Sequence, residues 1–261
     1  MTSDDPSELS GPAGTAVVPE SVPATDRPRR AGRLVALVTL IVLGLAGVLG
    51  GGFGLRRELT RGPTKAEVAA ALAAEIGSRW ERLPAGTIFP RTISYPDVAG
   101  NTATATLVGI APRATCQLAL EPAALMQLRS VHCTAMLRAT YLGAGGAIAA
   151  TVGIAVLPSA AAAEKAHGDL TLQPGSGLYA LPYAGTMASS FTNAARATAG
   201  VQFAGPYLFV FTAGYTDGQP GGTIAPGNSG ELSALGTGIL GAAEKTLTSH
   251  GSPCSMRDIS C

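Results

Sequence analysis

The sequence predicts an α+β domain that follows a single transmembrane helix. The first observation is an uncharged apolar segment at residues 34–55, which is long enough to cross a hydrocarbon core of ~30 Å as a helix. The second is a series of apolar segments paired across Gly-containing turns, a pattern typical of antiparallel hairpins. The third is a set of capped amphipathic segments between and after these hairpins. We therefore expect an antiparallel sheet with helices packed mainly on one face.

These patterns divide the chain into five parts. Residues 1–33 contain several prolines among Ser, Thr, Asp and Gly, without apolar periodicity, and predict a disordered cytoplasmic tail. Residues 34–55 predict a retained signal anchor. A cleaved signal peptide is the alternative, but its apolar core would be long and no clear A-x-A site follows. We then expect a juxtamembrane linker at 56–63, an extracytoplasmic domain at 64–250 and a Cys-containing tail at 251–261.

The orientation of this anchor depends on the cysteines. Four basic residues stand on each side of the apolar segment: Arg27, Arg29, Arg30 and Arg33 precede it, and Arg56, Arg57, Arg61 and Lys65 follow it. The positive-inside rule therefore does not decide which end of the helix is cytoplasmic. All four cysteines follow the segment, and an even number there is typical of a disulfide-permitting compartment. We therefore expect a cell-membrane protein with a cytoplasmic N-terminus and an extracytoplasmic C-terminal domain.

The four cysteines allow three connectivities. Local pairing, Cys116 with Cys133 and Cys254 with Cys261, is favoured because each pair flanks a short segment that can fold back. The sequence contains no C-x-x-C, so a zinc ribbon or a thioredoxin-type redox site has little support.

The extracytoplasmic domain is predicted to begin with a helix. Thr64 and Glu67 form a capping box directly after Pro63. An apolar residue then recurs at every fourth position and predicts one apolar stripe: Val68, Leu72, Ile76 and Trp80. We expect this stripe to pack on the domain and the helix to end at residues 83–86.

The other elements of the domain follow in chain order. They are a coil or short strand at 87–95, a strand at 102–110, a helix at 121–130, strands at 133–142 and 147–157, a helix at 160–167, an ambiguous segment at 178–191, strands at 198–203 and 207–214, a loop at 217–227 and a helix at 231–247. Residues 143–146 and Gly205-Pro206 are the expected hairpin turns, and Ser159 is the expected N-cap of the helix at 160–167. The strand at 207–214 is apolar on both sides and should be central.

Charge argues against some partners. Lys and Arg number 18 and Asp and Glu number 17, so the formal net charge is +1 and nucleic acid is not an expected partner. Charged residues are sparse between residues 101 and 228. This composition suits neither a domain that recognises its partner through charge nor one that binds a highly charged substrate. We expect no cofactor.

One segment resembles part of an enzyme. Residues 227–230, GNSG, resemble the nucleophile segment of trypsin-like serine proteases, and His132 beside a cysteine resembles the histidine of that family. Three departures argue against a protease. The segment between Cys116 and the next cysteine is helical in pattern, Glu231 stands where a glycine is expected, and only residues 230–261 follow Ser229. We instead expect Asn228 to cap the last helix, with Glu231 reaching back.

Other catalytic and metal chemistry has little support. The three histidines, at positions 132, 167 and 250, show no metal-ligand spacing, so we expect no metal site. Asp169 and Asp217 could be brought together by folding as the paired carboxylates of a glycoside hydrolase, although nothing in the sequence selects them. We therefore predict that the protein is not an enzyme.

Two sets of segments resemble known families. Residues 151–166 (TVGIAVLPSAAAAEKA) and 205–218 (GPYLFVFTAGYTDG), the latter followed by a closing helix, are similar to the extracytoplasmic sensor domain of actinobacterial PknH-like receptor kinases and related lipoproteins. Residues 79–90 (RWERLPAGTIFP) and 133–141 (CTAMLRATY) resemble uncharacterised actinobacterial single-pass membrane proteins. The first resemblance implies a domain held by two disulfides, with a ligand-binding cleft. Signalling by phosphorylation is not implied for this chain, because no kinase domain precedes the anchor. The resemblance also assigns no functional residue.

The sequence therefore predicts a non-catalytic domain that binds a ligand, an envelope component or a protein partner. A cell-envelope hydrolase is the alternative, and a structural subunit of a membrane complex is a third hypothesis. Gly47 and Gly51, like Gly50 and Gly54, have a spacing that would let two anchor helices pack as a homodimer. The aromatic residues Tyr141, Tyr207 and Phe209 offer a way to separate these hypotheses. A deep pocket lined by them would favour ligand binding, whereas a core filled by them would favour a protein-interaction role.

Overall fold

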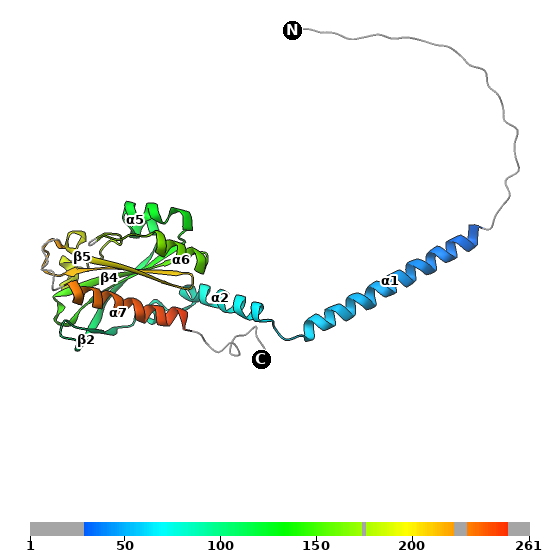
Figure 1. Cartoon of the computed structure of the whole chain (residues 1–261), viewed down its shortest axis with the longest axis horizontal. Helices are drawn as coiled ribbons and strands as arrows, with labels where there is room; N and C mark the ends of the chain where they lie inside the picture. Colours follow the sequence, from blue (N-terminus) through cyan, green and yellow to red (C-terminus); the bar gives the residue numbers. More distant parts are fainter. Residues whose placement is uncertain (1–28, 174–175, 222–228, 250–261) are drawn as a thin grey trace, which may run out of the picture. The chain divides into compact units, whose positions relative to one another are not determined.

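The computed structural model describes residues 29–173, 176–221 and 229–249, and the chain divides into two units, Met1–Arg61 and Gly62–Cys261 (Figure 1). The described part of the first unit is one helix, α1 (Arg29–Thr60). Its segment Gly32–Thr60 has a mean hydropathy of 2.5, is not buried against other residues, and is long and apolar enough to cross a membrane. The predicted apolar helix is thus present.

α1 is longer than the segment predicted as an anchor. It begins within the predicted tail, at Arg29, and continues through most of the segment predicted as a linker, to Thr60. The extensions, RRAGR before the uncharged segment and RRELT after it, are each rich in Arg, which is a strong helix former. Near the end, Arg61 forms an ion pair with Glu58 at 2.5 Å. The helix therefore extends beyond the uncharged segment at both ends.

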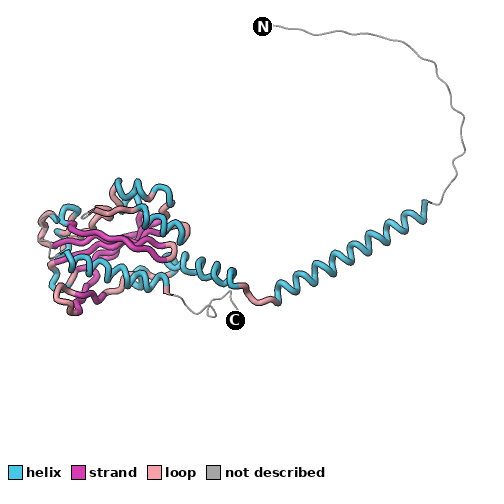
Figure 2. Tube along the Cα trace, in the orientation of Figure 1, coloured by secondary structure: helices cyan, strands magenta, loops and turns pink. Residues whose placement is uncertain are grey.

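The second unit contains an antiparallel sheet, whose strands are magenta in Figure 2. Among the described residues six strands form it, in the order β1-β2-β3-β4-β6-β5. Their bounds are β1 (Thr92–Pro96), β2 (Thr102–Ala114), β3 (Ala135–Leu142), β4 (Ile148–Val156), β5 (Arg196–Ala204) and β6 (Tyr207–Tyr215). The predicted hairpins correspond to β3–β4 and β5–β6, and both are confirmed. β6 lies between β4 and β5, as its two apolar faces predict.

Three predicted elements differ clearly from those observed. The helix predicted at 121–130 is divided into α5 (Pro122–Gln127) and a 3-10 helix, η1 (Arg129–Val131). β2 runs to Ala114 instead of residue 110, because irregular pairing after Ala111 lets it continue beside β3. The region predicted as a coil or short strand contains both a one-turn helix, α3 (Ala85–Ile88), and β1.

The ambiguous segment at 178–191 forms no regular strand. Its single bridge pairs Leu178 with Leu120, and it ends in a 3-10 helix, η3 (Met187–Ser190). It is held on the sheet by hydrogen bonds to buried threonines: Leu181 N donates to Thr151 Oγ1 over 3.0 Å, and Thr140 Oγ1 donates to Leu181 O over 2.9 Å. The segment therefore covers part of one sheet face without adding a strand to it.

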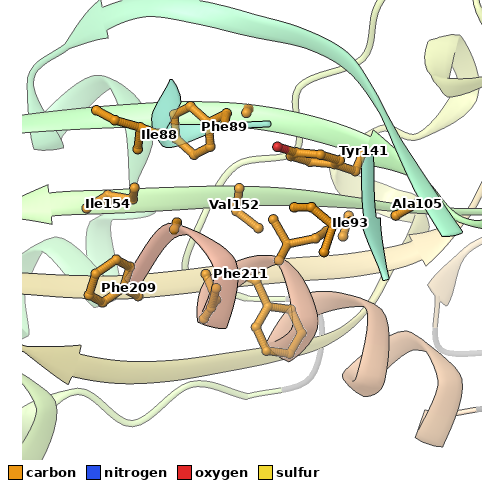
Figure 3. Close-up of a cluster of buried hydrophobic side chains, with 14 of the residues drawn as sticks. Ile88, Phe89, Ile93, Ala105, Tyr141, Val152, Ile154, Phe209 and Phe211 are labelled. Carbon is orange, nitrogen blue, oxygen red and sulfur yellow. The ribbon is translucent and has the colours of Figure 1, made fainter. Parts of the chain in front are cut away.

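One face of the sheet packs against the last helix, α7 (Ser229–Thr248), and against residues of α2 (Lys65–Arg82) and α3. The core between them contains large aromatic and aliphatic side chains, several of which are drawn in Figure 3. α7 buries the residues that the sequence predicted on its inner face: Leu232, Leu235, Ile239, Leu240 and Ala243. Gly236 lies against the ring of Phe211, which allows the close approach of helix and sheet.

The other face is also covered by helices, which differs from the expectation of helices mainly on one face. α4 (Cys116–Ala119), α5 (Pro122–Gln127), η1 (Arg129–Val131) and α6 (Ala160–Asp169) pack there on Met136, Ala155, Leu208 and Val210. The physical reason is that every residue of β4 is buried, so both of its faces need cover. Ser159 accepts a hydrogen bond from Ala162 N over 3.1 Å, which confirms it as the N-cap of α6.

The structure joins Cys116 and Cys133 in a disulfide with a Cα–Cα distance of 6.2 Å. This bond connects α4 to the segment just before β3, and it confirms the local pairing predicted for these two residues. Cys254 and Cys261 lie outside the described residues.

The second unit has a core of its own. The hydrophobic clusters of the described residues consist of buried side chains between Ile76 and Leu247, and α1 contributes none of them. Residues 62–261 thus meet the main requirement for independent folding. They can be studied without α1.

The close approach at Gly236 makes a testable prediction. A Cβ at this position would lie 2.2 Å from Phe211 Cδ2, so Gly236→Ala should lower the free energy of unfolding by about 1–3 kcal/mol. Urea unfolding of residues 62–261 measures this change. The matched control is Gly241→Ala in the same helix, where nothing lies within 4 Å and stability should stay equal or rise by up to ~1 kcal/mol. Equal losses in both variants would contradict the packing of α7.

Candidate functional site

The residues that resembled a protease lie on different layers of the domain. Ser229 is the first residue of α7, which covers one face of the sheet. His132 follows η1, whose Val131 belongs to the core on the other face, and it has a left-handed backbone (φ 52°). The sheet thus lies between the two elements that carry Ser229 and His132. Asn228 lies outside the described residues, so its predicted capping role is not visible.

The two carboxylates considered for hydrolysis have local partners. Asp169 accepts a hydrogen bond from Lys165 Nζ over 2.6 Å within α6. Asp217 accepts one from the backbone N of Gln219 over 3.0 Å in its own turn. Within residues 29–173, 176–221 and 229–249, no group of three or more His, Cys, Asp and Glu side chains could hold a metal ion. His250 lies outside this part of the chain.

The aromatic residues that could have lined a pocket instead fill the core. Tyr141, Tyr207 and Phe209 are fully buried in the cluster between the sheet and α7. Figure 3 shows Tyr141 and Phe209 in this cluster. Tyr141 Oη donates to Pro90 O over 2.9 Å, and Tyr207 Oη donates to Ile76 O over 2.5 Å. Burial raises the pKa of both phenols, that of Tyr207 to about 12, so each remains a neutral donor near neutral pH.

A groove with a volume of about 580 Å³ lies at one end of the domain, and we call it the α2 groove. Its lining comes from α2, from the connection between β4 and α6, and from the turn between β5 and β6: Ala69, Leu72, Ala73, Ala74, Ile76, Gly77, Leu157, Pro158, Ser159, Ala160, Gly205 and Pro206. None of these residues is charged. The single hydroxyl among them, that of Ser159, is already engaged as the N-cap of α6.

The groove exists because α2 packs on the domain through only one half of its length. Within α2, Ile76 is buried and Trp80 packs against the core, as the predicted stripe requires. Leu72 and Val68, one and two turns before Ile76, are only half-buried and belong to none of the clusters of described core residues. The prediction that the whole stripe packs on the domain is thus right for its second half and wrong for its first.

Polar contacts hold α2 in this position. Arg79 forms an ion pair with Glu75 at 2.7 Å and donates to Leu247 O over 3.1 Å, which connects α2 to the end of α7. The hydrogen bond from Tyr207 to Ile76 O connects α2 to β6. The hydrogen bond from Arg79 is the main cause that lowers the pKa of Glu75, and burial opposes it. The α2 side of the groove is therefore fixed before anything binds.

The β5–β6 turn forms the opposite side of the groove. Gly205 has a left-handed backbone (φ 55°), and a Cβ there would lie 3.3 Å from Ile76 Cγ2. Pro206 O accepts a hydrogen bond from Leu157 N over 2.9 Å, which holds the turn beside the β4–α6 connection. The turn residues were predicted as a turn, but no pattern in the sequence indicated that they face α2.

A second, smaller cavity of about 280 Å³ lies at the other half of α2. The guanidinium of Arg113, from β2, is 4.3 Å from the centroid of the Trp80 ring, an arrangement favourable for a cation–π interaction. This cavity is lined by charged as well as apolar residues. The α2 groove is larger and more uniformly apolar, so it is the better candidate for a binding site.

No protein-family model, curated protein or solved structure matches this chain. The resemblance to the sensor domains of receptor kinases therefore stays a prediction. The case for a functional site rests on the geometry of the α2 groove.

The Glu75–Arg79 pair generates a prediction about pH. Because the folded-state pKa of Glu75 lies below its ordinary value, the pair stabilises the fold above that value and is lost as pH falls through the lowered pKa. Glu75→Gln should therefore lower the free energy of unfolding by roughly 1 kcal/mol near neutral pH and flatten its acid dependence. Urea unfolding at several pH values between about 7 and about 3 tests this.

Glu81→Gln is the matched control for this experiment. Glu81 lies in the same helix and is exposed. Its substitution should leave both the stability and the acid dependence close to those of the unchanged domain. An acid dependence that Glu75→Gln does not alter would show that the pair with Arg79 contributes no net stability.

Proposed function

We propose that this chain is a single-pass membrane protein whose extracytoplasmic domain binds an apolar segment of a protein partner in the α2 groove, without catalysis. The anchor is α1, whose segment Gly32–Thr60 is long and apolar enough to span a membrane. The Cys116–Cys133 disulfide supports placement of the domain in an oxidising compartment, outside the cytoplasm. The N-terminus would then be cytoplasmic.

The observation that carries this proposal is the half-buried apolar stripe in the first half of α2. Leu72 and Val68 lie on the same face as Ile76, yet no cluster of described core residues contains them. A contiguous apolar surface on a domain is typical of an interaction site, because its burial by a partner removes it from water. At ~25 cal/mol per Å², burial of one Leu side chain and its surroundings supplies about 1.5–3 kcal/mol of binding free energy.

The shape of the site favours a protein segment over a small polar molecule. The lining offers apolar side chains and small residues but no charged side chain that could orient a polar ligand. The aromatic side chains that could have made a deep ligand pocket are packed in a filled core. A helix or extended segment with a few apolar anchors would fit such a groove.

A charge placed in the groove tests this function. Leu72→Asp should abolish partner binding, because binding would bury an unpaired carboxylate. Ala70→Asp adds the same charge to an exposed position of α2 outside the lining and should leave binding intact. A photo-crosslinking amino acid at Ala73, in the full chain in its native membrane, provides the measurement. We expect one main crosslinked product, retained in Ala70→Asp and lost in Leu72→Asp. A product that survives Leu72→Asp would contradict the groove as the binding site.

The disulfide tests the proposed location. Non-reducing peptide mapping of the full chain isolated from membranes should recover the Cys116–Cys133 peptide pair. Replacing both residues by Ser should lower the free energy of unfolding by about 3 kcal/mol, because the sequence separation is 17 residues and the unfolded chain loses its cross-link. Free thiols at both positions in the isolated protein would argue for a reducing compartment and against an extracytoplasmic domain.

A further inference from the structure

β5 forms one edge of the sheet and pairs with β6 on one side only. Its first residues approach Gly221. We call residues 199–204 the β5 edge. Their backbone N–H and C=O groups form no hydrogen bond with the backbone of any described residue outside the β5–β6 pair. The side chains there are partly exposed, and Phe203 is 38 % exposed. An edge of this kind presents unpaired N–H and C=O groups to another strand.

The β5 edge lacks the features that normally prevent such pairing. Its sequence, AGVQFA, contains no charge and no proline, and the irregularity of β5 lies earlier, between Arg196 and Thr198. The opposite edge of the sheet is different. β1 has five residues, ends at Pro96, and is flanked by Arg91 and Asp97. Among the described strands, β5 therefore has the less protected edge.

Helices restrict how a partner could approach the β5 edge. On one face, Gln202 Nε2 donates to Glu244 Oε2 of α7 over 2.8 Å. On the other face, the ring of Phe203 lies 5.1 Å from that of His167 in α6. A partner that follows the strand must therefore extend the sheet in its own plane, by adding one more strand.

We propose that the β5 edge pairs antiparallel with the β5 edge of a second copy of this chain, so that the two sheets join into one. In a symmetric antiparallel pair, each copy contributes the same segment, so a charged residue there would bring two like charges into one short strand pair. Residues 199–204 contain no charged residue, so two copies can pair without repulsion between like charges. Because the β1 edge is protected, pairing stops at two copies and forms a closed dimer instead of a fibre.

This interface is separate from the α2 groove and from the Gly47 and Gly51 spacing in α1. It uses an edge of the sheet that neither of them includes. If both copies are anchored in one membrane, their high local concentration would favour even a weak strand pairing.

Residues 62–261 allow the strand pairing to be measured without any contribution from α1. Sedimentation velocity over a range of concentrations should show a reversible monomer–dimer equilibrium. Phe203→Lys should weaken the association by about tenfold or more, because it places a positive charge in each copy of a short strand pair that otherwise carries none. Ser94→Lys places the same charge at an exposed position of β1 and should leave the association unchanged.

Hydrogen exchange of the unchanged domain gives a second test that needs no variant. Amides within residues 199–204 should exchange more slowly at high protein concentration than at low concentration, and β1 should show no such dependence. This measurement decides the question if circular dichroism shows that Phe203→Lys does not fold. A domain that stays monomeric at all concentrations, an equal effect of Ser94→Lys, or assemblies larger than a dimer would overturn the proposal.

Discussion

The burial of β4 and β6 on both faces is the constraint on which the rest of the domain depends. Every residue of β4 is buried, and so is every residue of β6 except Tyr215. Strands of this kind cannot lie at a solvent-exposed face, so each face of the sheet needs its own layer. α7 with parts of α2 and α3 supplies one layer, and α4, α5 and α6 supply much of the other.

The second layer is completed by irregular chain, which must satisfy its own polar groups. Thr140 and Thr151 are fully buried on neighbouring strands, and their hydroxyl oxygens lie 2.9 Å apart. Both also bond to the backbone of Leu181, so the loop above them is paired much as a strand would be. Buried hydroxyls without such partners would cost ~1–3 kcal/mol each, so the loop and the threonines depend on one another.

An ion pair between buried Arg196 and half-buried Glu121 fixes the start of the same loop. Arg196, at the start of β5, contacts the carboxylate of Glu121 and donates to Leu178 O over 2.8 Å. Glu121 also accepts a hydrogen bond from Gly177 N over 2.8 Å. Burial alone would raise the pKa of Glu121, but the hydrogen bonds and the charge of Arg196 lower it, so the carboxylate stays ionised. The pair therefore gives the irregular segment a defined position.

Much of the fold could be predicted from local patterns in the sequence, because those patterns are decided by neighbours along the chain. Elements of this kind are the apolar run of α1, the capping box of α2, the N-cap of α6, the hairpins β3–β4 and β5–β6, the inner face of α7 and the Cys116–Cys133 pair. Hydrophobic periodicity, turn residues and short loop closure carry enough information to specify them.

Tertiary structure alone decided which surfaces are covered. The insertion of β6 beside β4, the helices on both faces, the half-packed α2 and the unpaired edge of β5 depend on contacts between segments far apart in the sequence. The stripe of α2 is continuous in sequence, yet Ile76 is buried and Leu72 is not, because the β5–β6 turn reaches only part of the helix. The sequence by itself determined the long apolar helix and the local elements, whereas the candidate groove arises only where three distant segments meet.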